Sequence, residues 1–224
     1  MLVSNHHNVF HHEAASGNIE ELRDTVVDDI HSLLRKPVSF AKIGASDLTS
    51  DEVARMGRRY RRLLHHGCFH ENRGFANELI WKWTEATGKY LGCQFWSLNA
   101  KQLFDVEAAK CGELRTLASV EAELCRRHRP KDAKLTHEHV YPIKDMTLWL
   151  QDHKEADRYE LRNYLDRLCI GCVVLESEHD RKPGTLPNPW LRYSEAGIRL
   201  APNPAWPSAQ TLLIEEARLL RGSE

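Results

Sequence analysis

The sequence predicts an α+β protein that is mainly α-helical, and two patterns are the basis of this prediction. Apolar residues recur three or four positions apart through most of residues 18–128, which is the periodicity of one face of an α-helix. Two short segments, 134–140 and 172–175, instead alternate loosely or are rich in β-branched residues, as strands are. We therefore expect a helical region over residues 1–128, followed by a second region over 129–224 that contains strands.

The first half of the chain carries the signals of five helices. Asn18 with Glu21 has the spacing of a capping pair, and Thr49–Glu52 has that of a capping box. Gly112 separates the last two helices as a C-cap. Residues 90–96 are apolar and aromatic, and short enough for a strand or a buried turn. The expected helices run from Asn18 to just before Pro37, from Thr49 to near Gly67, through Leu79, Ile80 and Trp83 to Gly88, from Asn99 to Cys111, and from Glu113 to His128.

The second half of the chain is less regular. Residues 145–168 form a highly charged stretch with helical spacing of leucines, and the strand at 172–175 leads to Ser177, an N-cap candidate for a short helix. Residues 183–207 contain six of the nine prolines, so we expect an irregular wrapping segment with one helical turn at Tyr193–Ala196. A last helix is expected over 208–220.

Composition excludes several classes of protein. The 31 basic and 32 acidic side chains nearly cancel, which argues against a protein that coats nucleic acid along its whole surface. No apolar run is long enough to span a bilayer, and the first residues lack the pattern of a secretory signal. The six cysteines are scattered over 224 residues, unlike a dense disulfide framework. We expect a cytoplasmic protein that does not bind membranes and has reduced thiols.

The most informative segment is Glu138-His-Val-Tyr-Pro142. It resembles the first motif of the HNH, or ββα-metal, endonuclease family, in which an acidic residue or histidine precedes a histidine, Ile or Val, any residue and proline. A second segment, from Cys172 to His179, resembles the second strand and the helix start of that family. Val174 stands five residues before His179, the interval seen in the colicin-type members. The resemblance covers about residues 130–185 and implies a ββα-metal core after the helical region, with a C-terminal helix.

The resemblance implies specific roles at the site. Glu138 and His179 would be metal ligands, and His139 the general base that activates a water, because a neutral imidazole suits that task near neutral pH. His137 and Asn163 are further candidates, the first as a ligand or a structural residue and the second as the residue that orients the base. The ligand types favour Mg²⁺ or Mn²⁺ and also admit Zn²⁺ or Ni²⁺.

The chain departs from the family pattern in three places. No residue clearly matches the middle Asn or His of the motif, and Asn163 falls inside an expected helix. Forty residues separate His139 from His179, so we interpret 145–168 as a helix inserted between the two strands. A third histidine ligand is absent four residues after His179, where Pro183 stands. A His-x-His pair also arises by chance in a chain with 13 histidines.

Two basic clusters bear on the substrate. Each is expected to contact phosphates, with a solvated helix face as the alternative interpretation. The first cluster lies within residues 55–62, and the second lies within residues 126–134, directly before Glu138. The clusters consist of Arg55, Arg58, Arg59, Arg61 and Arg62, and of Arg126, Arg127, Arg129, Lys131 and Lys134.

The resemblance implies a metal-dependent endonuclease that hydrolyses phosphodiester bonds, and with the basic clusters it makes double-stranded DNA the expected substrate. Restriction or phage defence is the context suggested by the family, and the N-terminal helices would position DNA, dock a protein partner or form a homo-oligomer. The alternative is a zinc-stabilised nucleic-acid-binding or regulatory module without turnover, and an RNA-directed nuclease stays open as a weaker possibility. Cys169 and Cys172 have the spacing of half a zinc knuckle, but we favour their interpretation as buried small residues.

Overall fold

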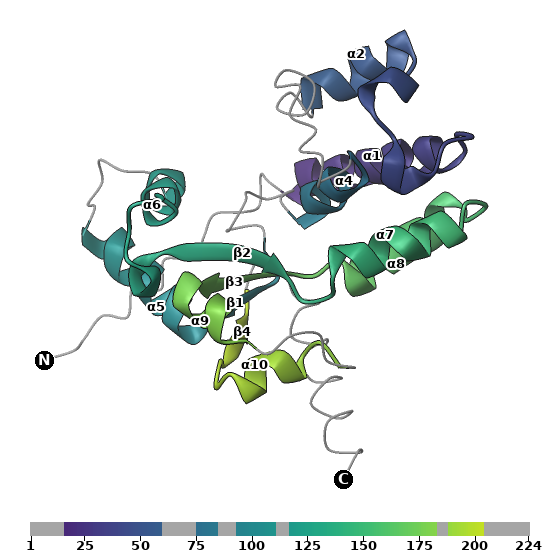
Figure 1. Cartoon of the computed structure of the whole chain (residues 1–224). Coiled ribbons are helices and arrows are strands. Elements are labelled where there is room, and N and C mark those ends of the chain that lie inside the picture. Colours follow the sequence, from purple (N-terminus) through teal and green to yellow (C-terminus); the bar gives the residue numbers. More distant parts are fainter. Residues whose placement is uncertain (1–15, 60–74, 85–92, 111–116, 183–187, 204–224) are drawn as a thin grey trace, which may run out of the picture.

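A computed structural model describes residues 16–59, 75–84, 93–110, 117–182 and 188–203, and all structural statements concern these residues. Their helices and strands form an α+β fold that is mainly helical, as the sequence predicts (Figure 1). The α-helices are α1 (Ser16–Leu34), α2 (Ser50–Arg59), α4 (Phe75–Thr84), α5 (Leu98–Lys110), α6 (Leu117–Leu124), α7 (Ile143–Asp152), α8 (Arg158–Leu168), α9 (Glu176–Arg181) and α10 (Leu191–Glu195). Three 3-10 turns are η1 (Phe40–Lys42), η2 (Ala45–Asp47) and η4 (Lys131–Ala133).

The strands form one mixed sheet in the order β2-β3-β1-β4. They are β1 (Phe95–Ser97), β2 (Leu135–His139), β3 (Gly171–Leu175) and β4 (Leu200–Pro202). Strand β3 is antiparallel to β2 and parallel to β1, and β4 is antiparallel to β1. The sheet therefore takes strands from both sides of the predicted boundary after residue 128.

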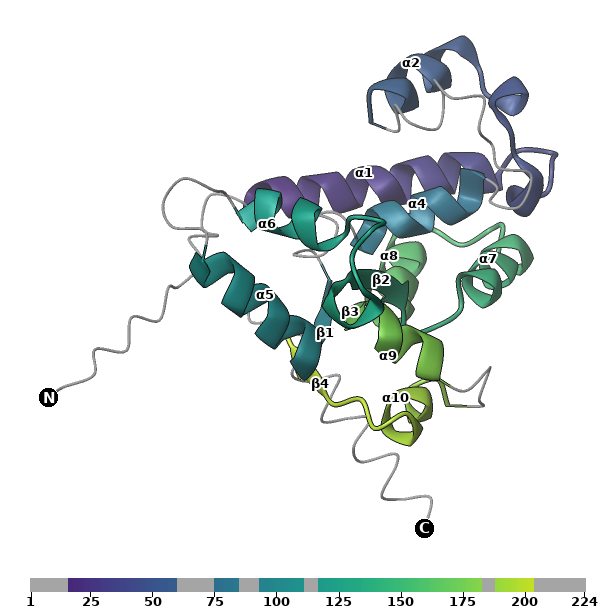
Figure 2. The ribbon, with the colours of Figure 1, turned by 60° about the vertical axis from the view of Figure 1, so that its left-hand side comes forward.

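The sheet separates two groups of helices. Figure 1 shows α1, α4, α7 and α8 to the right of the sheet and α5 and α6 to its left, and Figure 2 shows α1 and α4 side by side above the strands. The first group packs around a core that includes Ile30, Trp83, Leu150 and Leu165. The two faces of the sheet have separate cores: Val173 packs with residues of α5 and α6, whereas the next residue along β3 packs with α10.

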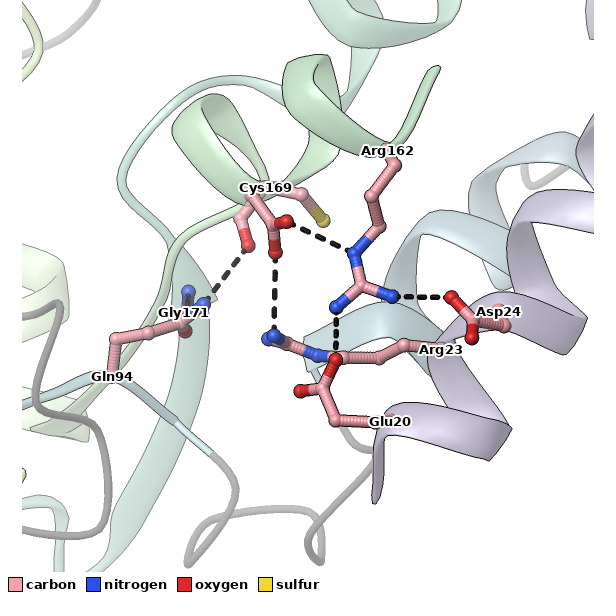
Figure 3. Close-up of polar contacts among 8 residues, drawn as sticks. Glu20, Arg23, Asp24, Gln94, Arg162, Cys169 and Gly171 are labelled. Carbon is pink, nitrogen blue, oxygen red and sulfur yellow. Dashed lines mark hydrogen bonds and ion pairs between the residues drawn. The ribbon is translucent and has the colours of Figure 1, made fainter. Parts of the chain in front are cut away.

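An ion-pair network joins α1 to α8. The Arg162 guanidinium donates to Asp24 at 2.6 Å, to Glu20 at 2.5 Å and to Asp166 at 2.9 Å (Figure 3). Arg23 of α1 pairs with the same Asp166, and burial is the main cause that lowers the pKa of Arg23 to about 10. Both guanidinium groups lie over the Trp83 ring of α4. Ion pairs therefore join α1 to α8, and cation–π contacts join both helices to α4.

The Gln94 side chain fixes the start of β3. Its amide nitrogen donates to the Cys169 carbonyl at 3.3 Å, and its amide oxygen accepts from the Gly171 N–H at 2.7 Å (Figure 3). Gln94 directly precedes β1, so one buried side chain supplies hydrogen bonds to the turn that leads from α8 into the sheet. This places β3 beside β1 across 77 residues of sequence.

Most elements of the sequence prediction are confirmed. The Thr49 and Glu52 capping box is present, with bonds of 3.2 and 2.7 Å in the two directions. The helix α1 is also confirmed, although its bounds put Asn18 inside the helix, so the predicted capping role of Asn18 is wrong. The expected helix ends near Gly67 and Gly88, the C-cap at Gly112, and the helix over 208–220 lie outside the described residues.

Three local predictions are corrected. Residues 145–168 form two helices instead of one, because Asp157 and Glu160 make a capping box that starts α8 after a break. The helix α9 begins before Ser177, and Glu178 caps its first turn by accepting from the Leu175 N–H at 2.9 Å. The proline-rich segment contains the strand β4, which is the edge strand of the sheet among the described residues, a position where Pro202 is tolerated. None of the described helices has the length and apolar character required to cross a membrane.

Candidate functional site

The candidate site lies where α9 follows β3 and packs beside β2. Two ion pairs tie α9 to the chain that enters β2: Lys131 pairs with Asp180, and Lys134 pairs with Glu176 at 2.9 Å. The register of the two strands sets Glu138 opposite Cys172 and His139 opposite Gly171. A side chain at the end of β2 therefore lies close to the short helix that comes 41 residues later.

Glu138, His179 and Lys182 meet at this place. The Glu138 carboxylate is only 7% exposed, and its Oε2 atom is 2.8 Å from His179 Nδ1. Lys182, at the end of α9, contacts the same oxygen through its ammonium group, and its side chain is 5% exposed. The second carboxylate oxygen, Oε1, is buried and has no hydrogen-bond partner among the described residues. The His179 side chain is 47% exposed, which makes it the solvent-facing member of the group.

A second cation, Arg192 of α10, lies beside Lys182. Both groups approach the Tyr193 ring, the Lys182 nitrogen at 5.1 Å from its centroid and the guanidinium carbon of Arg192 at 6.0 Å. Burial, and then the charge of Arg192, lowers the pKa of Lys182 to about 7. Nothing in the sequence singles out Lys182 and Arg192, since each is one of many basic residues. The packing of α9 brings Lys182 to Glu138, and the packing of α10 brings Arg192 to the end of β2.

The structure does not bring His139 to Glu138 and His179. Neighbouring residues of a strand point to opposite faces, and the His139 ring lies against Trp81 and Thr84 of α4. The Thr84 hydroxyl is 3.3 Å from His139 Nε2, while His139 Nδ1 is buried without a hydrogen-bond partner among the described residues. Burial lowers the pKa of His139 to about 3, so the ring is neutral and a weak base in this position.

His137 shares the environment of His139. Its ring stacks on that of His139 with centroids 5.3 Å apart, and its Nε2 atom is 3.4 Å from the Thr84 hydroxyl. Thr84 donates its own proton to the Trp81 carbonyl at 3.0 Å, so its oxygen is left to accept from the imidazoles. The two contacts are hydrogen bonds when each ring carries its proton on Nε2. The geometry assigns the histidine pair to the contact between α4 and β2.

Asn163 is also distant from the group around Glu138. It is exposed on α8 and lines a pocket between α7 and α8 together with Trp149 and Tyr164. None of the residues that line this pocket belongs to the Glu138 group. Within the described residues, Asn163 therefore has no geometric basis for orienting a base at His139.

The second basic cluster is largely neutralised by neighbouring acids. Arg126 and Arg129 pair with Glu123 at 3.0 and 3.6 Å, and Lys131 and Lys134 pair with residues of α9. Arg127 is exposed, and no ion pair to it occurs among the described residues. Of the first cluster, Arg55 pairs with Asp29, Arg58 and Arg59 lie on α2 with side chains that are not described, and Arg61 and Arg62 lie outside the described residues.

The two cysteines of the predicted half knuckle do not face a common site. Both side chains are fully buried and free of disulfides, but Cys169 packs in the helical core and Cys172 in the core beneath α10. Burial raises the pKa of both thiols, which disfavours the thiolate that zinc requires. These contacts are those of small buried residues.

The donor atoms at Glu138 suit a metal ion with few protein ligands. In the described part of the chain, no three or more His, Cys, Asp or Glu residues gather as a metal cluster. A buried carboxylate oxygen without a partner and an adjacent, half-exposed imidazole nevertheless offer a hard and a borderline donor. A metal ion at this place would share the Glu138 carboxylate with Lys182, because the Lys182 ammonium already contacts one of its oxygens. A comparison of the chain with protein-family models, curated proteins and solved structures gave no match.

Proposed function

We propose that this protein is a metal-dependent endonuclease of the HNH type that hydrolyses phosphodiester bonds, with DNA as substrate. One observation carries the proposal: the antiparallel strands β2 and β3 and the helix α9 bring Glu138 and His179 to 2.8 Å, although 41 residues separate them. The order strand, strand, helix and the residue types at the contact agree with the resemblance read from the sequence. The proposed context is a cytoplasmic restriction or phage-defence system.

The chain's own residues would divide the work at this site. Glu138 and His179 would hold a divalent ion, Mg²⁺ or Mn²⁺ by preference, through the free carboxylate oxygen and the imidazole. A bound ion would supply Lewis acidity to the phosphate and lower the pKa of a coordinated water. Lys182 adds positive charge beside the carboxylate, where charge on the reacting phosphate would be stabilised.

His139 has a different role in this proposal from the one that the motif implies. Its ring is on the opposite face of β2, neutral and held near Thr84, so it acts as a structural contact of α4. In this arrangement His139 would not serve as the general base for a water at the bound ion. This difference makes the roles of Glu138 and His139 experimentally separable.

Metal titration and cleavage assays with matched variants test the proposal. Glu138→Gln and His179→Gln should each weaken Mn²⁺ binding, measured by calorimetry, and abolish nicking of supercoiled DNA. His139→Gln should keep Mn²⁺ affinity, because its ring does not reach the ion. Lys101→Met, on an exposed i,i+4 ion pair of α5, serves as the control with unchanged binding and cleavage.

The same assay defines the substrate. Supercoiled, linear and single-stranded DNA and a labelled RNA are incubated with Mg²⁺, Mn²⁺, Zn²⁺ or Ni²⁺ in parallel. Cleavage of RNA alone would replace DNA by RNA as the substrate, and absence of cleavage with every polymer and ion would reject the nuclease proposal. Equal Mn²⁺ affinity in wild type and Glu138→Gln would reject the metal site.

A further inference from the structure

The group around Glu138 contains more positive than negative charge. Lys182 and Arg192 both approach the Tyr193 ring, and Glu138 is the single carboxylate that contacts either of them among the described residues. The Lys182 side chain is 5% exposed, so water does not fully solvate its charge. One carboxylate for two cations leaves one positive charge without an acidic partner among the described residues, and an anion from outside would compensate it.

Arg192 is held by main-chain carbonyls and not by an acid. It donates to the Val140 carbonyl at 2.6 Å and to the Pro189 carbonyl at 3.2 Å, with a longer contact of 3.5 Å to the His139 carbonyl. These bonds fix the guanidinium at the end of β2 but leave its charge intact. No described residue accepts from its Nη1 atom, so the guanidinium has a donor to spare.

We propose that Lys182 and Arg192 form an anion-binding pocket that holds phosphate oxygens of a nucleic-acid backbone beside Glu138. This inference rests on the proposed nuclease function and names the residues that position its substrate. The Lys182 ammonium has three donors and gives one to Glu138, so the others are available to a phosphate without breaking that pair. The half-exposed His179 marks the side from which the phosphate enters.

The pocket has a chemical selectivity that follows from its donors. Ammonium and guanidinium groups contact phosphate oxygens and not base edges, so binding here is independent of sequence. The cluster before β2 is partly compensated by Glu123, Glu176 and Asp180, whereas no acid pairs with Arg192 among the described residues. Loss of the Lys182 charge should therefore reduce the affinity for every nucleic-acid sequence to the same extent.

The test is the salt dependence of nucleic-acid binding in EDTA, where no metal bridges the two partners. Binding of a short labelled DNA duplex and of a labelled RNA is followed by fluorescence anisotropy at several salt concentrations. Lys182→Met should weaken binding and reduce the slope of log Kd against log salt by about 0.9 for duplex DNA, the value for one phosphate contact. Lys182→Arg should keep the slope, and Lys101→Met is the control that should not change it.

A second variant separates the pocket from a structural role of the Lys182 pair. Glu138→Gln removes the competing negative charge, so it should strengthen nucleic-acid binding in EDTA while it weakens Mn²⁺ binding. A purely structural ion pair would instead make Glu138→Gln and Lys182→Met weaken binding alike, and that result would overturn the inference. If Lys182→Met does not fold, as judged by circular dichroism, the comparison of Glu138→Gln with Lys182→Arg carries the test.

The outcomes distinguish this inference from the proposed function. A reduced salt slope in Lys182→Met together with no cleavage under any metal would keep the anion pocket and reject the nuclease. Metal-dependent cleavage with an unchanged salt slope in Lys182→Met would keep the nuclease and reject the pocket.

Discussion

The Glu178 carboxylate accepts a hydrogen bond of 2.5 Å from the Ser97 hydroxyl, and this contact joins α9 to the end of β1. The carboxylate is 1% exposed and also accepts from the Leu175 N–H and from the Asn99 amide, each at 2.9 Å. Ser97 in turn accepts from the Ala100 N–H at the start of α5. The residue next to His179 is thus the anchor that sets where α9 presents its imidazole.

Glu178→Ala should lower the free energy of unfolding by about 3 kcal/mol, because it leaves buried donors of Ser97 and Leu175 without an acceptor. Urea unfolding followed by circular dichroism measures this change. Asn99→Ala removes one donor at the exposed edge and should cost less than 1 kcal/mol, on the order of one ordinary hydrogen bond. Equal losses for the two variants would contradict the anchoring role of Glu178.

The buried His139 ring predicts a pH dependence of stability. Its pKa is lowered from 6.5 in the unfolded chain to about 3 in the fold by burial, so between these values the unfolded chain binds the additional proton. The free energy of unfolding should therefore decrease as the pH falls from about 6.5 toward about 3, by up to about 1.4 kcal/mol per pH unit.

His139→Gln removes this proton linkage. Urea unfolding at pH 7.5, 6 and 5 should give a shallower pH dependence for the variant than for the wild type, with the difference confined to values below about 6.5. Parallel curves for the two proteins would show that His139 is not buried in the neutral form.

Gly171→Ala should destabilise the fold because β3 passes very close to its neighbours at this position. An added Cβ would lie 3.0 Å from Cys93 Sγ and from His137 Nε2, and 3.1 Å from the Thr84 Cβ. We expect a loss of about 1–3 kcal/mol, measured by thermal unfolding, as for other overpacked cores. Gly44→Ala is the matched control, since its Cβ would meet nothing closer than 3.7 Å. A Gly171→Ala protein as stable as that control would refute the close approach.

Arg162→Met should loosen the contact of α1 with α8. The partners Glu20, Asp24 and Asp166 are 58%, 73% and 40% exposed, so each pair is weak and the sum with the Trp83 stacking is about 1–2 kcal/mol. High salt screens exposed pairs, so the difference from wild type should shrink in about 1 M NaCl. Chemical unfolding at low and high salt measures both values, and a loss that does not depend on salt would assign the effect to packing alone.

Local signals in the sequence were sufficient for the elements that obey them. Apolar spacing predicted α1 and α4, the Thr49 capping box predicted the start of α2, and the β-branched run predicted β3. The break between α7 and α8 was also readable, because Asp157 and Glu160 have capping-box spacing, but the leucine pattern on both sides concealed it. The strand β4 carries no such signal, since it is three residues long and contains a proline.

The sequence by itself determined which residue types stand next to each other, and it selected Glu138 and His179 as partners from motif spacing. Only the tertiary structure decided which face of β2 meets α9, and this choice puts Glu138 in contact with Lys182 while it places His139 against α4. The physical reason is that strand alternation fixes opposite directions for neighbours, whereas the packing of distant helices determines what each direction meets. The positive charge beside the Glu138 carboxylate depends on that packing, and the periodicity of the sequence does not predict it.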